Sequence, residues 1–196
     1  MERHVDGREI VAVPDRASWR RWLAERHEQP DSIWLVFHKQ TSNGSSPSYE
    51  EAVEEALCFG WIDSTVNKLD EHRTLQLFAP RKPKGTWAAS NKERAARLER
   101  EGLLAPAGIA AIELAKENGS WTALDAVERL EEPAELAAAL DADIPARENW
   151  SGFSPSSRKA ILWWIVSAKR PETRARRVER TVRMAAKGLR AQIDSE

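Results

Sequence analysis

The sequence predicts an α+β fold: a small mixed sheet with two helices, in the order βαβαββ, followed by a helical C-terminal half. Three observations support this. The apolar run from Ile33 to Phe37 indicates a strand buried on both faces. Residues 62–66 and 74–78 alternate apolar and polar side chains, as strands with one buried face do. From Thr86 onward the apolar residues recur at helical spacing.

The first elements follow from local signals. Ile10–Val13 predicts a short strand. Asp15 is suited to cap the following helix, in which Trp19 and Leu23 fall on one side. Pro30-Asp31-Ser32 ends that helix, and the buried strand follows.

A second helix and a hairpin complete the predicted sheet region. Ser48-Tyr49-Glu50-Glu51 forms a capping box, because Ser48 can accept from the backbone of Glu51 while Glu51 reaches back. The helix that it opens ends at Gly60. The alternating segments 62–66 and 74–78, joined across Asp70-Glu71-His72, predict an antiparallel hairpin.

The rest of the chain predicts helices. They run from Thr86 to Glu101, from Pro106 to Gly119, over Ala123–Leu130 and Pro133–Leu140, from Ser154-Pro155 to Arg170, and from Pro171 onward. The last helix should bury Val178, Val182, Ala185 and Leu189. We place the joint at Lys84–Thr86, so that an α+β part of residues 1–84 packs with an all-helical part of residues 85–196 as one globular unit.

Charge is unevenly distributed along the chain. The net charge is only −1, yet Arg158 to Arg190 contains 11 Lys/Arg against two Glu. Such a segment can be a polyanion-binding face, or it can match an acidic body of the same molecule. No helix-turn-helix or RNA-binding signature accompanies it, so we do not expect nucleic-acid binding.

The N-terminus and the single cysteine bear on compartment. Met1 to Asp6 is charged and lacks the apolar run of a secretory signal. Cys58 cannot form an intramolecular disulfide, and the longest apolar run, Ala160 to Val166, is far short of the ~20 residues that cross a bilayer. We therefore expect a cytoplasmic protein with no membrane insertion.

The richest mixture of polar and aromatic groups lies between Leu57 and Lys92. A rigid cationic loop, Arg81 to Trp87, precedes a predicted helix start, where backbone N–H groups attract anions. This pattern predicts a cleft for an anionic small molecule or peptide terminus, with a protein partner as a further option. Its predicted lining residues are Trp61, Asp63, Arg81, Lys84, Trp87, Asn91 and Lys92.

Two alternatives stay open for these residues. Arg81 and Lys84 can instead pair with acids of the helical half while Trp87 pins the halves together. Asp63, with Asn91 or Lys92, can instead do acid–base work in an enzyme whose catalytic residues are otherwise unknown. A third hypothesis, an interaction protein, uses the basic C-terminal helix.

Other chemistries find little support. Cys58 lies in the last turn of a helix, where the negative end of the dipole disfavours a thiolate. The four histidines show no ligand spacing, so we expect no metal, and no cofactor motif such as a phosphate-binding Gly-Lys-Ser/Thr loop occurs. We lean away from an enzyme.

Two blocks of sequence resemble the YdeI/OmpD-associated family of bacterial proteins, also labelled bacteriocin-protection. The first runs from Tyr49-Glu50-Glu51-Ala52 through Phe59-Gly60-Trp61-Ile62-Asp63-Ser64 to Asn91-Lys92, and the second from Ser154-Pro155-Ser156 to Thr181-Val182. The resemblance implies association with an outer-membrane porin and protection against bacteriocins or related stress. It implies no agreed reaction. Relatives often carry serine after the Trp87-like position, where this chain has Ala88.

Overall fold

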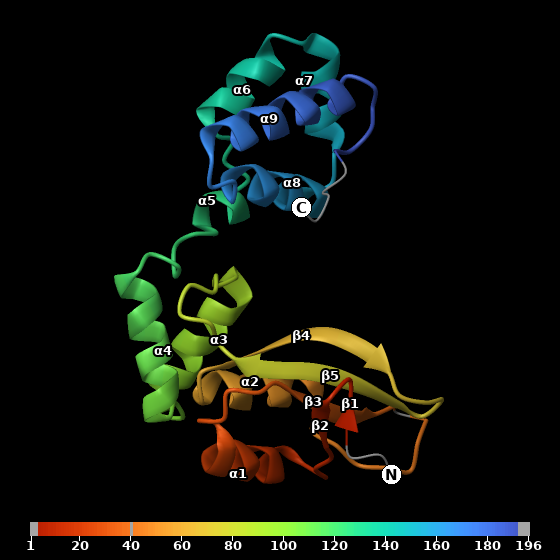
Figure 1. The fold of residues 1–196 in the computed structure, drawn as a ribbon, viewed down its shortest axis with the longest axis vertical. Coiled ribbons are helices and arrows are strands. Elements are labelled where there is room, and N and C mark those ends of the chain that lie inside the picture. Colours follow the sequence, from red (N-terminus) through yellow and green to blue (C-terminus); the bar gives the residue numbers. More distant parts are fainter. Residues whose placement is uncertain (1–3, 40, 192–196) are drawn as a thin grey trace. The chain divides into compact units, whose positions relative to one another are not determined.

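The computed structural model describes residues 4–39 and 41–191, and it divides into two compact units, one up to Thr122 and one from Ala123. The α+β prediction is confirmed: the first unit holds a five-stranded mixed sheet with helices, and the second is helical (Figure 1). The predicted joint at Lys84–Thr86 lies inside the first unit. The reason is that the two helices after it contribute Leu98 and Ile112 to the same core as the sheet.

The sheet has the strand order β1-β2-β3-β5-β4. The strands are β1 (His4–Val5), β2 (Arg8–Val11), β3 (Ile33–His38), β4 (Trp61–Lys68) and β5 (Arg73–Pro80). β2 and β3 run parallel, while the other neighbours are antiparallel. The predicted hairpin is β4–β5. The two-residue strand β1 was not predicted, because so short a segment carries no periodicity.

Helices α1 (Arg16–Arg26) and α2 (Tyr49–Cys58) cover one face of the sheet (Figure 1). Both predicted caps are present: the Asp15 side chain accepts from Ser18 N, and Ser48 and Glu51 form the reciprocal capping box. Gly60, with a φ of 74°, ends the second helix. These helices and the sheet share one core, which includes Trp19, Leu23, Ile33, Leu35, Leu57, Trp61 and Phe78.

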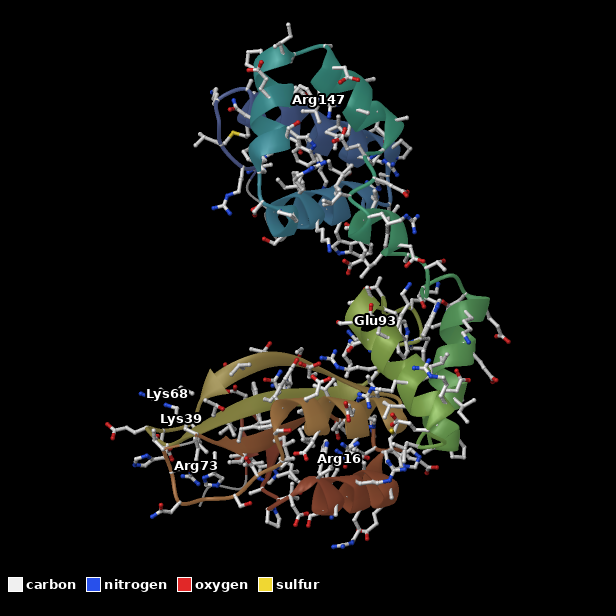
Figure 2. All side chains as sticks on the ribbon, turned by 180° about the vertical axis from the view of Figure 1, so that it is seen from behind. Arg16, Lys39, Lys68, Arg73, Glu93 and Arg147 are labelled. Carbon is white, nitrogen blue, oxygen red and sulfur yellow. The ribbon has the colours of Figure 1, made fainter. Side chains whose placement is uncertain are left out.

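The opposite face of the sheet carries a smaller cluster. Trp34, Val36 and Leu75 are buried there, which confirms that β3 is covered on both sides. At the hairpin end of the sheet, the labelled cations Lys39, Lys68 and Arg73 lie near one another (Figure 2). Lys39 N donates to His72 O at 2.9 Å, which ties the end of β3 to the hairpin turn.

Helices α3 (Ala89–Arg100) and α4 (Pro106–Glu117) complete the first unit. α3 begins later than predicted, because the chain stays extended through Ala88, with φ −68° and ψ 152°. α4 approaches the end of α2 closely at Gly108, where a Cβ would lie 2.3 Å from the Cys58 carbonyl oxygen. Only glycine fits this contact without a backbone shift.

A buried network of ion pairs joins three of these helices. Glu54 and Glu55 of α2 are 5% and 2% exposed. Glu55 accepts from Arg16 and Arg20 of α1, each at 2.6 Å, and Glu54 pairs with Arg97 of α3. Figure 2 shows Arg16 between α1 and α2. Because each buried carboxylate has a cationic partner, the desolvation cost of its charge is offset.

The second unit consists of helices around its own core. They are α5 (Asp125–Glu128), α6 (Ala134–Asp141), α7 (Ile144–Gly152), α8 (Pro155–Val166) and α9 (Pro171–Ala185). α7 was not predicted. In the predicted stripe of α9, Val178 and Ala185 are buried, whereas Leu189 is 52% exposed. The Leu189 prediction was wrong, because α9 ends at Ala185 and Gly188 turns the chain with a φ of 69°.

The apolar helix α8 begins after Ser154, whose side chain accepts from Ser157 N. Its 12 residues rise about 18 Å, less than the hydrocarbon thickness of a bilayer. Across residues 4–39 and 41–191, no helix combines the length and the apolar character needed to cross a membrane.

Candidate functional site

The cationic loop between β5 and α3 is fixed by backbone contacts at three points. Arg81 N donates to Gly60 O at 2.9 Å, and Gly85 N donates to Lys82 O at 2.8 Å. Asn118, at the end of α4, donates from Nδ2 to Pro83 O at 2.7 Å. The backbone of the loop is therefore held against α4 and the end of α2.

Arg81 and Trp87 form the centre of the site. The Arg81 guanidinium carbon lies 3.6 Å from the centroid of the Trp87 ring, a close cation–π contact. Trp87 is only 2% exposed and packs on Trp121, with ring centroids 4.9 Å apart. Within the part of the chain that the structure describes, the buried Nε and Nη2 of Arg81 have no hydrogen-bond partner.

This guanidinium is strongly desolvated. Burial lowers the pKa of Arg81 from its ordinary 12.5 to about 10, and the charge of Asp63 opposes that shift only in part. Arg81 therefore remains cationic at neutral pH. Two of its donors, Nε and Nη2, are shielded from water.

Asp63 is held by neutral donors. Its Oδ2 accepts from the Tyr49 hydroxyl at 2.8 Å and from Gln76 Nε2 at 3.1 Å. Burial, followed by this hydrogen bond to Asp63, raises the pKa of Tyr49 to about 12. Among the described residues Asp63 makes no hydrogen bond to Asn91, one of the two contacts on which the acid–base hypothesis depends.

Asn91 and Lys92 take part in neighbouring contacts at the start of α3. Asn91 Oδ1 accepts from Arg94 Nη1 at 3.1 Å. Arg94 also donates two hydrogen bonds to the Glu50 carboxylate, of 2.6 and 2.7 Å. Lys92 Nζ lies 5.6 Å from the centroid of the Trp121 ring, and Lys116 Nζ lies 5.4 Å from it. Two further cations thus stand beside the tryptophan that supports Trp87.

Of the remaining two predicted residues, Trp61 lies in the core and Lys84 lies on the cationic loop. Trp61 is fully buried in the core, where its Nε1 donates to His27 O at 2.9 Å and its ring meets Trp22 edge-on at 5.8 Å. Trp61 therefore presents no surface to a ligand. Lys84 is exposed on the loop.

Sequence reasoning missed four residues around this site: Tyr49, Gln76, Lys116 and Trp121. Tyr49 is the single tyrosine of the chain and lies inside the recognised capping box, and these two facts could have singled it out from the sequence. Trp121 has no such local signal, because it meets Trp87 from 34 positions along the chain.

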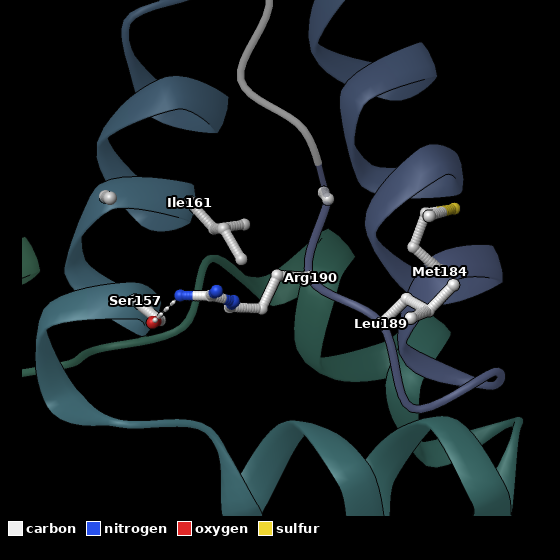
Figure 3. Close-up of a pocket in the computed structure, with 7 residues that line it drawn as sticks. Ser157, Ile161, Met184, Leu189 and Arg190 are labelled. Atoms are coloured by element: carbon white, nitrogen blue, oxygen red, sulfur yellow. Dashed lines mark hydrogen bonds between the residues drawn. The ribbon is translucent and has the colours of Figure 1, made fainter.

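Cys58, the potential metal ligands and a hollow in the second unit were the other candidates for a site. Cys58 is buried, and burial raises the pKa of its thiol, as expected for an unreactive cysteine. No group of three or more His, Cys, Asp or Glu in the described ranges is arranged to hold a metal ion. In the second unit a hollow of about 480 Å³ lies between α8 and the end of α9, where Arg190 donates to the Ser157 hydroxyl at 3.2 Å (Figure 3).

Comparisons with known proteins give two family matches. Residues 11–111 match a family described as a domain of unknown function (DUF8412). Residues 129–188 match the family described as Bacteriocin-protection, YdeI or OmpD-Associated, which includes the second of the two blocks noted in the sequence. The first block lies within the DUF8412 match. No curated protein and no solved structure matches the chain.

Proposed function

We propose that this chain, which belongs to the DUF8412 family and carries a domain of the Bacteriocin-protection, YdeI or OmpD-Associated family, is a binding protein for a small anion. The observation that carries the proposal is the Arg81 guanidinium, stacked on Trp87 with two buried nitrogens that find no acceptor among residues 4–39 and 41–191. A buried, unsatisfied charged donor is costly unless it serves a partner.

The ligand class follows from the donors. Arg81 offers two N–H groups in one plane, which suits the two oxygens of a carboxylate, while the Trp87 ring fixes the orientation of that plane. Lys92 and Lys116 add positive charge around Trp121. A peptide C-terminus or a small carboxylic acid therefore fits best. The carboxylate of Asp63, which accepts from Tyr49 and Gln76, disfavours ligands that place a second negative charge beside it.

Calorimetric titration of the full chain with small carboxylates and short peptides tests this site. Arg81→Gln should weaken binding by about tenfold or more, because hydrogen bonds to a charged donor contribute roughly 1.5–3 kcal/mol. The matched control is Arg100→Gln, an exposed arginine in the last turn of α3. Equal affinities for the two variants would refute the proposal.

The family description suggests the setting in which such binding is used. We propose that the anion-binding site serves protection of a bacterial cell against a bacteriocin or a related stress. Survival of a bacteriocin-sensitive strain that expresses the native chain or Arg81→Gln measures this. If Arg81→Gln protects the strain as well as the native chain does, the Arg81 site does not serve protection.

A further inference from the structure

A groove with an apolar lining lies between α6 and α9, which are neighbours in the second unit (Figure 1). It has a volume of about 760 Å³. Its apolar lining residues are Ala139 of α6, Pro171, Ala175, Val178 and Val182 of α9, and Ala186 at the end of α9. We propose that α9 of a second copy of the chain occupies this groove, so that two chains form a symmetric dimer with their α9 helices antiparallel.

The apolar residues of α9 form one continuous stripe. Positions 171, 175, 178, 182 and 186 are spaced by four, three, four and four residues, so their side chains lie on one side of the helix. Spacing of this kind is typical of helices that pack on other helices. Ala175 is exposed, and Val182 and Ala186 are only partly buried, so the stripe is accessible to a partner.

The stripe presents nearly the same order of side chains when it is read in either direction. Ala175 and Ala186 lie towards its two ends, and Val178 and Val182 lie between them. A two-fold axis near residues 180–181 would therefore place alanine opposite alanine and valine opposite valine. A symmetric dimer requires this property, because both copies bury the same patch.

Two charged residues of the groove follow the same symmetry. Glu179 and Arg183 are four residues apart, so they lie on the same edge of the stripe. When two helices pair in antiparallel directions, the same edge of each helix lies together. Glu179 of each copy would then lie opposite Arg183 of the other. Within one chain these side chains engage only at 3.8 Å and are 75% and 60% exposed, so the intermolecular pairs replace a weak contact.

The overall charge of the groove also fits a second copy. Three acidic and three basic residues line it, so their formal charges cancel. Glu135 of α6 pairs with Arg174 of α9, and Asp143 accepts from Ala146 N at 3.0 Å. A strongly charged partner would find no excess of opposite charge on this face, whereas a second copy brings the same balance.

The expected contact is small. α9 has 15 residues and therefore rises about 22 Å. An interface made by one pair of such helices and the walls beside them lies at the small end of specific protein interfaces. We therefore expect a reversible dimer with a Kd in the micromolar range.

Sedimentation velocity of the full chain at increasing concentration measures this equilibrium. Ala175→Gln places a larger side chain in the groove and should weaken dimerisation by about tenfold or more. The matched control is Ala110→Gln, at an exposed alanine of α4 in the other unit. It should leave the Kd within about twofold of that of the native chain.

An exchange of charge tests the predicted pairing directly. Glu179→Arg and Arg183→Glu each bring like charges together across the two-fold axis, so each variant alone should dimerise at least about tenfold more weakly. A mixture of the two variants should form heterodimers, because one then carries two cations at positions 179 and 183 and the other carries two anions. Recovery on mixing also shows that both variants are folded. Glu148→Arg, at an exposed residue of α7, is the control for charge reversal and should leave the Kd within about twofold.

Two outcomes would overturn the proposal. One is a monomer at every concentration up to about 500 μM, whether the groove then takes a helix of another protein or an apolar small molecule. The other is a dimer that neither Ala175→Gln nor the two charge variants weaken. Arg81→Gln should dimerise as the native chain does, so failure of the dimer is distinguishable from failure of the anion-binding site.

Discussion

Replacing Arg81 by methionine should make the first unit more stable while abolishing anion binding. The lowered pKa of Arg81, from 12.5 to about 10, corresponds to about 3 kcal/mol of free energy that the charged form costs in the folded state. Methionine removes this cost and keeps an unbranched side chain that packs on Trp87. It loses the cation–π contact, which contributes about 1–2 kcal/mol. The net expectation is an increase of about 1–2 kcal/mol in the free energy of unfolding.

Urea denaturation of the full chain, with the transition of the first unit identified by hydrogen exchange of β5 amides, measures this change. Arg100→Met is the matched control and should stay within about 0.5 kcal/mol of the native chain, because Arg100 is exposed. A loss of more than about 1 kcal/mol in Arg81→Met would show that Arg81 is a structural anchor and would refute the reasoning.

Three further predictions concern the first unit. Tyr49, the single tyrosine, should titrate at about 12 rather than 10 when followed at 295 nm after a pH jump. Asp63→Asn should lower this pKa only in part, because burial, the largest cause of the shift, remains. Because the pKa of Tyr49 is raised in the folded state, the stabilisation by its neutral form is fully present below pH 10 and is lost as pH rises toward 12. A pKa near 10 in the folded protein would contradict the burial of Tyr49 and its contact with Asp63. Gly108→Ala should lower the free energy of unfolding by about 1–3 kcal/mol, because the added Cβ meets the Cys58 carbonyl. Gly152→Ala in α7, where the added Cβ meets open space, should raise it by about 0.5–1 kcal/mol. Similar effects at both positions would contradict the close approach of α4 to α2. Glu55→Gln should destabilise by about 1–3 kcal/mol, since Arg20 loses its carboxylate partner and Arg16 keeps only Glu54, against less than about 0.5 kcal/mol for exposed Glu99→Gln; equal melting temperatures of the two variants would argue against the buried network.

Local signals accounted for much of the fold. The capping box at Ser48 and the Asp15 cap depend on hydrogen bonds within three residues, so the sequence alone predicts them correctly. The apolar run of β3 was equally direct. α7 was missed because Ile144-Pro145 resembles a break, although proline is compatible with the first turn of a helix.

The candidate site was predictable only in part. Arg81 and Trp87 lie on one short loop, so their proximity follows from the sequence. The burial of Trp61 does not, since it depends on α1 covering that face of the sheet through Trp22. Likewise, the contacts of Asp63 with Tyr49 and of Trp87 with Trp121 join different elements, and no spacing rule connects them.

The paired carboxylates in the middle of α2 also set the alignment of its neighbours. At a purely apolar interface, one helix can shift by a turn along its neighbour, since one methyl group substitutes for another. Here, a slide of α1 or α3 past α2 would separate Glu54 and Glu55 from Arg16, Arg20 and Arg97. The ion pairs therefore fix the position of α3 along α2. Because the cationic loop leads directly from β5 into α3, they also fix the distance between the end of β5 and the start of α3.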